Sequence, residues 1–134
     1  MKFMLMMNAP RGKSGNWDVV NWTPEDLKAH IGFMVRFHKE LKEEGALVGA
    51  EGLASPGEAR IVRASKSSGA PEVTDGPFAE SKEFLAGYWI VDVESPQQAY
   101  AIAGRASAAP GPGGKPLNMP IEVREVMSGP PVDP

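Results

Sequence analysis

The stretch GYWIVDVESPQQAYAIA, residues 87–103, holds the clearest strand and helix signals of the 134-residue chain. Its first seven residues, Gly87–Val93, are rich in aromatic and β-branched side chains, which favour strands. Ser95 then predicts a helix cap, with Pro96 suited to the first helical position and Gln98 completing a capping box. A strand that leads directly into a capped helix indicates a domain that mixes helices and strands.

A second helix is predicted upstream, beginning after Thr23 and ending before Gly45. Thr23 can cap the first turn, Pro24 suits the first helical position, and Glu25 and Asp26 complement the positive end of the helix dipole. Gly45 is a natural left-handed stop. Apolar residues recur at helical spacing and predict a buried stripe. They are Leu27, Ile31, Met34, Val35 and Leu41.

The remaining strands are predicted from shorter apolar segments. They are Lys2–Met7, Ala46–Ala50, Ala59–Ala64, Glu72–Thr74 and Ile121–Val126. The resulting order, β-α-β-β-(β)-β-α-β, predicts an α+β ferredoxin-like sandwich, an antiparallel sheet with two main helices on one face. We expect a single domain over residues 1–134, with a flexible tail at residues 128–134.

Both faces of the strongest strand require cover. Trp89 and Val91 alternate with Tyr88 and Ile90, so apolar side chains point to both sides of the sheet. Two helices cover only one face, and a second subunit commonly covers the other. We therefore expect a homodimer in which the open sheet face is buried between subunits.

Composition excludes several classes of function. The chain has no cysteine, which rules out disulfides and thiolate metal sites and fits a reducing, cytoplasmic location. Its net charge of -3 gives no basic footprint for nucleic acid, and no apolar stretch approaches the ~20 residues that span a membrane. We expect no metal site, because His30 and His38 are two helical turns apart. We expect no cofactor, because phosphate-binding and dinucleotide motifs are absent.

The segment DGPFAESKE, residues 75–83, is the most distinctive part of the chain. Its Asp-Gly pair predicts a turn, and Pro77 prevents a regular strand. We expect an ordered loop in which Phe78 is buried against the core and Asp75 bonds to backbone amides.

This segment lies within VTDGPFAESKEFLAGYWIVDV, residues 73–93, which resembles the DGPF branch of the YCII-related family. The resemblance covers nearly the whole chain and includes LKEEGALVGAEGL at 41–53, ESPQQAYAIA at 94–103 and IEVREV at 121–126. It implies a ferredoxin-like fold, usually dimeric, related to the dimeric α+β barrels that include small isomerases and monooxygenases. It also implies a link to extracytoplasmic-function sigma factors, near which relatives are often encoded.

His38 is the first candidate for chemistry. Helical phase places it near the centre of the apolar stripe, so it points at the sheet or into a cleft, whereas His30 lies at the edge. His38 is then either a buried, neutral, structural histidine or a general base or acid that a carboxylate orients, for which Asp75 is the best candidate. The resemblance implies a His–Asp pair. The family's histidine position holds Met34 here and its acidic position holds Glu43, so the motif does not assign the His–Asp pair to residues of this chain.

Three charged residues are candidates for ligand binding, namely Glu80, Lys82 and Arg124. Lys82 with its neighbouring glutamates would bind a polar ligand or form surface ion pairs, and ion pairs are the more common arrangement. Arg124 shares a sheet face with Glu122 and would bind an acidic ligand, Glu122 or a partner-chain carboxylate. The three tryptophans, Trp17, Trp22 and Trp89, would line a pocket or pack in the core or dimer interface.

The residues support three hypotheses about function. The first is a small cofactor-independent enzyme, with His38 as base and Asp75 as its orienting carboxylate, acting on a small polar metabolite. The second is a non-catalytic dimer that binds a metabolite or regulates a partner such as a sigma factor. The third is a stress-related protein whose dimer surface matters more than any pocket. The surroundings of His38 discriminate between the first two.

Overall fold

The computed structural model describes residues 1–10, 22–65, 67, 69–78 and 80–129. Trp17 and residues 130–134 of the expected tail lie outside the described residues. The main elements are β1 (Lys2–Pro10), α1 (Pro24–Glu43), β2 (Leu47–Gly52), β3 (Arg60–Arg63), β4 (Glu72–Asp75), β5 (Glu83–Asp92), α2 (Pro96–Ser107) and β6 (Ile121–Glu125). Two short 3-10 turns, η3 (Pro56–Glu58) and η4 (Pro112–Gly114), lie between them.

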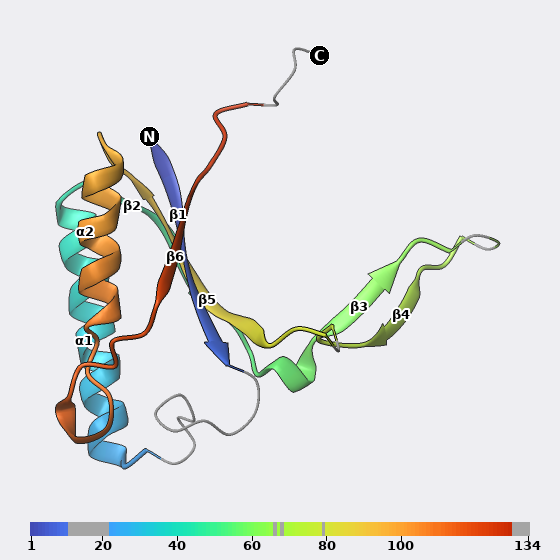
Figure 1. Ribbon diagram of the computed structural model, residues 1–134, viewed down its shortest axis with the longest axis horizontal. Helices are drawn as coiled ribbons and strands as arrows, with labels where there is room; N and C mark the ends of the chain where they lie inside the picture. Colours follow the sequence, from blue (N-terminus) through green and yellow to red (C-terminus); the bar gives the residue numbers. More distant parts are fainter. Residues whose placement is uncertain (11–21, 66, 68, 79, 130–134) are drawn as a thin grey trace.

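Four of the strands form one antiparallel sheet in the order β2-β5-β1-β6. Both helices pack on the same face of this sheet, so the predicted α+β ferredoxin-like class is confirmed (Figure 1). β3 and β4 pair only with each other in the described part of the chain, and we call these two strands the β3–β4 arm. The arm projects from the body of the protein, away from the helices (Figure 1).

Local capping starts both helices where the sequence predicts. The Thr23 hydroxyl accepts a hydrogen bond from the Asp26 amide at 3.1 Å, and the Ser95 hydroxyl accepts one from the Gln98 amide at 3.3 Å. The Gln98 side chain reaches back to the Glu94 amide at 2.7 Å, one residue before the cap. Gly45 ends α1 with a φ of 75°, as expected for a left-handed stop.

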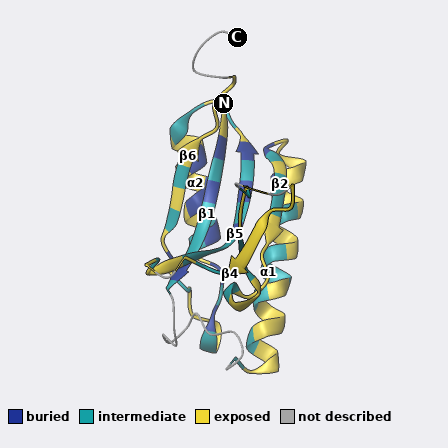
Figure 2. Ribbon diagram, turned by 90° about the vertical axis from the view of Figure 1, so that its right-hand side faces the viewer, coloured by how far each residue is buried: buried dark blue, intermediate teal, exposed yellow. Residues whose placement is uncertain are grey.

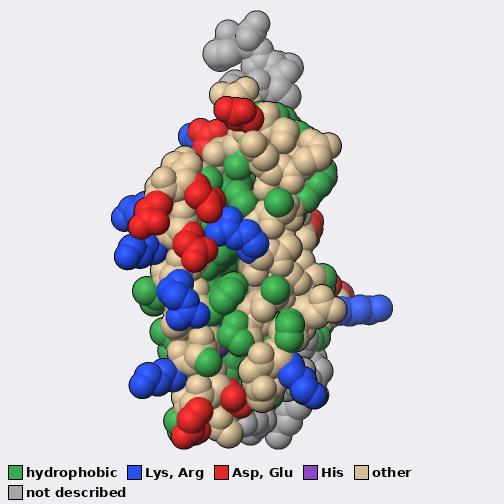
Figure 3. Space-filling model, turned by 90° about the vertical axis from the view of Figure 1, so that its left-hand side faces the viewer, with side chains coloured by type: hydrophobic (Ala, Val, Ile, Leu, Met, Phe, Trp, Pro, Cys, Tyr) green, Lys and Arg blue, Asp and Glu red, His purple; other side chains and the backbone are tan. Residues whose placement is uncertain are grey.

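The core lies between the helices and the sheet. Its most buried side chains include Leu5, Leu41, Val91 and Met119 (Figure 2). On the outer side of the helices, the Arg105 guanidinium bonds to Glu40 at 3.0 Å and to Glu44 at 3.2 Å, which ties α2 to α1. Figure 3 shows charged side chains of both signs on this outer surface, with hydrophobic side chains visible between them.

The predicted apolar stripe of α1 is wrong, because the buried side of the helix is rotated relative to the stripe. Leu41 is buried and Met34 packs on the core, but three members of the stripe are exposed. They are Leu27, Ile31 and Val35. The side of α1 that the sheet covers carries Phe37, with Phe33 packed beside it. Aromatic rings bury more apolar area than branched aliphatic side chains, so they decide which side of the helix turns inward.

The segment at residues 75–83 also differs from its prediction. Phe78 is 57% exposed and is not a core anchor. The Asp75 side chain is 95% exposed and pairs with Arg60 across the arm at 3.7 Å, so the expected bonds to backbone amides are wrong. The physical reason is the position of the segment, which runs from the last residue of β4 to the first residue of β5, where the projecting arm joins the body (Figure 1).

Candidate functional site

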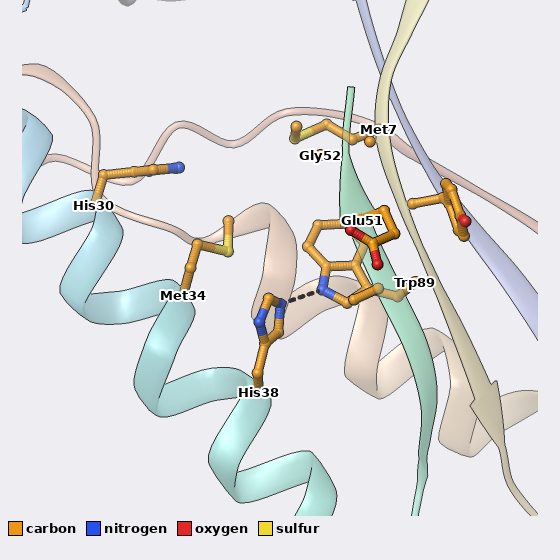
Figure 4. Close-up of a pocket in the computed structure, with 10 residues that line it drawn as sticks. Met7, His30, Met34, His38, Glu51, Gly52 and Trp89 are labelled. Atoms are coloured by element: carbon orange, nitrogen blue, oxygen red, sulfur yellow. Dashed lines mark hydrogen bonds between the residues drawn. The ribbon is translucent and has the colours of Figure 1, made fainter. Parts of the chain in front are cut away.

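A cavity of about 250 Å³ lies between α1 and the sheet. α1 contributes His30, Met34 and His38, which are four residues apart and therefore project from successive turns on one side of the helix (Figure 4). The sheet contributes apolar side chains from Met7, Ala50 and Trp89, and the strand residues Glu51 and Tyr88 also line the cavity. The walls are therefore mostly apolar, with two imidazoles and one carboxylate among the lining residues (Figure 4).

The strands approach closely behind this cavity because Gly87 has no side chain. A Cβ atom at Gly87 would lie 3.0 Å from the Glu51 carbonyl oxygen and 3.4 Å from the Gly52 Cα. In the β2–β5 register Ala50 lies opposite Trp89 and Glu51 lies opposite Tyr88. Because side chains alternate along a strand, those of Ala50 and Trp89 share the helix-covered face.

His38 accepts a hydrogen bond from Trp89. The indole Nε1–H donates to His38 Nε2 at 2.9 Å (Figure 4). An indole nitrogen can only donate, so Nε2 must be unprotonated, and a neutral imidazole in this bond carries its hydrogen on Nδ1. Protonating Nε2 would set two hydrogens against each other and break the bond.

Burial also favours the neutral form of His38. Desolvation lowers the pKa of His38 from its ordinary value of 6.5, because the charged imidazolium is poorly solvated between the helix and the sheet. The rings of Phe37 and Trp89 lie 6.0 and 6.4 Å from the His38 ring, centroid to centroid. His38 is therefore a neutral side chain whose remaining polar group is the Nδ1–H donor.

His30 is held differently. Its Nδ1 lies 3.0 Å from the Pro110 carbonyl oxygen, and its ring packs edge-on against Trp22 at a centroid distance of 5.3 Å. Pro110 belongs to the segment between α2 and β6, so the C-terminal part of the chain positions a side chain at the start of α1. Helical phase predicts His30 only as a residue at the edge of the apolar stripe. The spacing of His30, Met34 and His38 was the available signal that all three face one cavity.

The structure does not bring the predicted carboxylate to the predicted histidine. Asp75 lies in the β3–β4 arm with Arg60 as its ion-pair partner, whereas His38 lies in α1 with Trp89 as its hydrogen-bond partner. The two residues of the hypothesised His38–Asp75 pair therefore have different partners in this structure.

The predicted ligand-binding residues lie apart from the cavity. Glu80 and Lys82 are exposed between β4 and β5, and neither lines the cavity. Arg124 lies in β6 opposite Met4, on the same sheet face as Glu122, as expected. Glu122 accepts a hydrogen bond from the Asn8 side chain at 3.2 Å.

Two further absences concern only the residues that the structure describes. Within them, no group of three or more histidine, aspartate or glutamate side chains is placed to hold a metal ion. His30 and His38 are separated by about 12 Å along the axis of α1, too far to ligate one ion together. No described helix is long and apolar enough to cross a membrane.

A family model described as the YCII-related domain matches residues 1–111. The chain belongs to the YCII-related family. The YCII-related match includes every residue that lines the cavity and ends before β6, so Arg124 lies outside it. A comparison with curated proteins finds no match.

Proposed function

We propose that this YCII-related domain binds a small molecule in the cavity between α1 and the sheet, with His38 as a hydrogen-bond donor. The observation that carries the proposal is the 2.9 Å hydrogen bond from Trp89 to His38 Nε2. A general base needs a free lone pair, and the only lone pair of neutral His38 is already used. The Nδ1–H group of His38 has no hydrogen-bond partner among the described residues and is available to a ligand.

The cavity restricts the class of ligand. A volume of about 250 Å³ suits a small metabolite rather than a nucleotide or a peptide. Met7, Met34 and Trp89 offer apolar contact surface, and Nδ1–H requires an acceptor. The expected ligand therefore has a mainly apolar body and a carbonyl or carboxylate oxygen.

The enzymatic alternative uses His38 as a general base oriented by Asp75, with no cofactor. It is not favoured, because that role would require His38 to break its bond to Trp89 and Asp75 to leave the arm. The non-catalytic binding dimer is the reading that needs no such rearrangement.

A homodimer is part of the same proposal. Neither helix covers the second face of the sheet, where Met4 lies opposite Ile90 and Met6 lies opposite Tyr88 (Figure 1). This apolar row favours burial against a second copy. Sedimentation at micromolar concentration should give a dimer for the native chain and a monomer for Ile90→Glu, and a monomeric native chain would end this part of the proposal.

The binding proposal is tested by thermal shift with a panel of small carboxylic acids, ketones and aldehydes. Compounds that stabilise the native protein should not stabilise His38→Phe, which keeps a ring but has no donor. His38→Asn places an amide N–H near the position of Nδ1–H and should retain part of the effect. Lys82→Ala is the matched control outside the cavity and should behave as the native protein does. Equal stabilisation of His38→Phe would refute the donor role.

A further inference from the structure

The second imidazole of the cavity has the opposite hydrogen-bonding character. A carbonyl oxygen can only accept, so the 3.0 Å contact with Pro110 requires a hydrogen on Nδ1 of His30. In the neutral ring, Nε2 then carries a lone pair. Within the described residues, no hydrogen bond is made to Nε2 of His30.

His30 is therefore an oriented imidazole with a free acceptor atom. A bond from Nδ1–H to a backbone carbonyl fixes both the tautomer and the plane of a histidine ring. The edge-on contact with Trp22 holds the same ring from another side. Figure 4 shows the ring extending from α1 toward the strands, on the side of the cavity that His38 and Met34 also face.

From this geometry we infer that His30, not His38, is the hydrogen-bond acceptor of the cavity. The ligand then carries a hydrogen-bond donor at one end and an acceptor at the other. This inference rests on the proposed function, in which His38 Nδ1–H meets the acceptor. The O–H or N–H group of the ligand donates to His30 Nε2. A small hydroxy-carbonyl or amino-carbonyl compound has the required pair of groups.

The hydrogen bonds of His30 and His38 predict different rates of chemical modification, which can be measured without a ligand. Diethyl pyrocarbonate acylates the free lone pair of a neutral imidazole. The ring nitrogen bonds to the carbonyl carbon, the imidazole loses its other N–H proton, and the ethyl carbonate leaving group departs as ethanol and carbon dioxide. Nε2 of His30 is free for this attack, whereas Nε2 of His38 is occupied by Trp89.

The chain has only these two histidines, so mass spectrometry of the modified protein assigns each reaction directly. At neutral pH, His30 should be acylated about tenfold faster than His38, a ratio equivalent to about 1.4 kcal/mol. Trp89→Phe should raise the rate at His38 and leave the rate at His30 unchanged. The variant His30→Gln should lose the fast reaction altogether.

Equal rates at the two histidines, or faster reaction at His38, would overturn the inference. Because Trp89→Phe removes part of the core, long-range ¹H–¹⁵N spectra of the native protein provide a second test. They should show Nε2 of His30 without a hydrogen, and an Nε2–H signal for His30 would also overturn the inference. A hydrogen on Nε2 of His30 would overturn this inference alone, because the expected loss of ligand stabilisation in His38→Phe depends on His38 and Trp89.

Discussion

The substitution Trp89→Phe isolates the hydrogen bond on which the account of His38 depends. It removes the indole N–H that donates to His38 at 2.9 Å and keeps a single ring in a position that is only 4% exposed. Removing a buried tryptophan entirely costs about 3–5 kcal/mol, and a lost hydrogen bond costs about 0.5–1.5 kcal/mol. Because phenylalanine retains one of the two rings, we expect a loss of about 2–3 kcal/mol in the free energy of unfolding.

The same substitution should raise the pKa of His38. Nε2 becomes free to take a proton, so only burial continues to oppose the charged form. The assay is an NMR titration of the His38 ring protons, with urea denaturation to measure stability. Tyr88→Phe, whose side chain projects from the opposite face of the same strand, is the matched control and should leave the pKa of His38 unchanged. An unchanged pKa of His38 in a folded Trp89→Phe protein would mean that the hydrogen bond from Trp89 does not oppose protonation of His38.

Three further outcomes follow from the structure. The folded-state pKa of His38 lies below its ordinary value of 6.5, so the unfolded chain binds more protons than the folded protein near that pH. The free energy of unfolding should therefore fall as the pH drops below about 6.5 and level off below the folded-state pKa. This loss should be absent from His38→Gln when unfolding is measured across that range. Phe78→Ala should cost less than about 1 kcal/mol, because the ring is 57% exposed, and a loss of about 3–5 kcal/mol in urea denaturation would mean that the ring is buried. Arg105→Ala should lower the melting temperature measurably, since it removes ion pairs that join α2 to α1, and Arg36→Ala, on α1 but outside this network, is its control.

The features that sequence predicted well are those that depend on neighbouring residues. Thr23 and Ser95 accept hydrogen bonds from amides three residues along the chain, so the local sequence contains both partners. The strong strand was also found, although β5 begins at Glu83, earlier than the predicted Gly87, because pairing with β1 continues to Pro10. Local propensity does not report how far a neighbouring strand extends.

The features that sequence missed depend on partners distant along the chain. Trp89 is 51 residues from His38, and Pro110 is 80 residues from His30, so neither tautomer was visible in the sequence of α1. The burial of Phe78 was inferred from its chemistry alone, whereas its exposure follows from the projecting arm. Burial of an apolar side chain is favourable, but the fold determines whether the side chain lies next to a surface against which it can pack.

The proposed role of His38 depends on its being a neutral hydrogen-bond donor. A long-range ¹H–¹⁵N spectrum of the histidine rings in the native protein at neutral pH measures this property. We expect His38 to carry its hydrogen on Nδ1 and Nε2 to have the shift of an unprotonated nitrogen that accepts a hydrogen bond. A hydrogen on Nε2 of His38, or on both ring nitrogens, would rule out the hydrogen bond from Trp89 and with it the donor role.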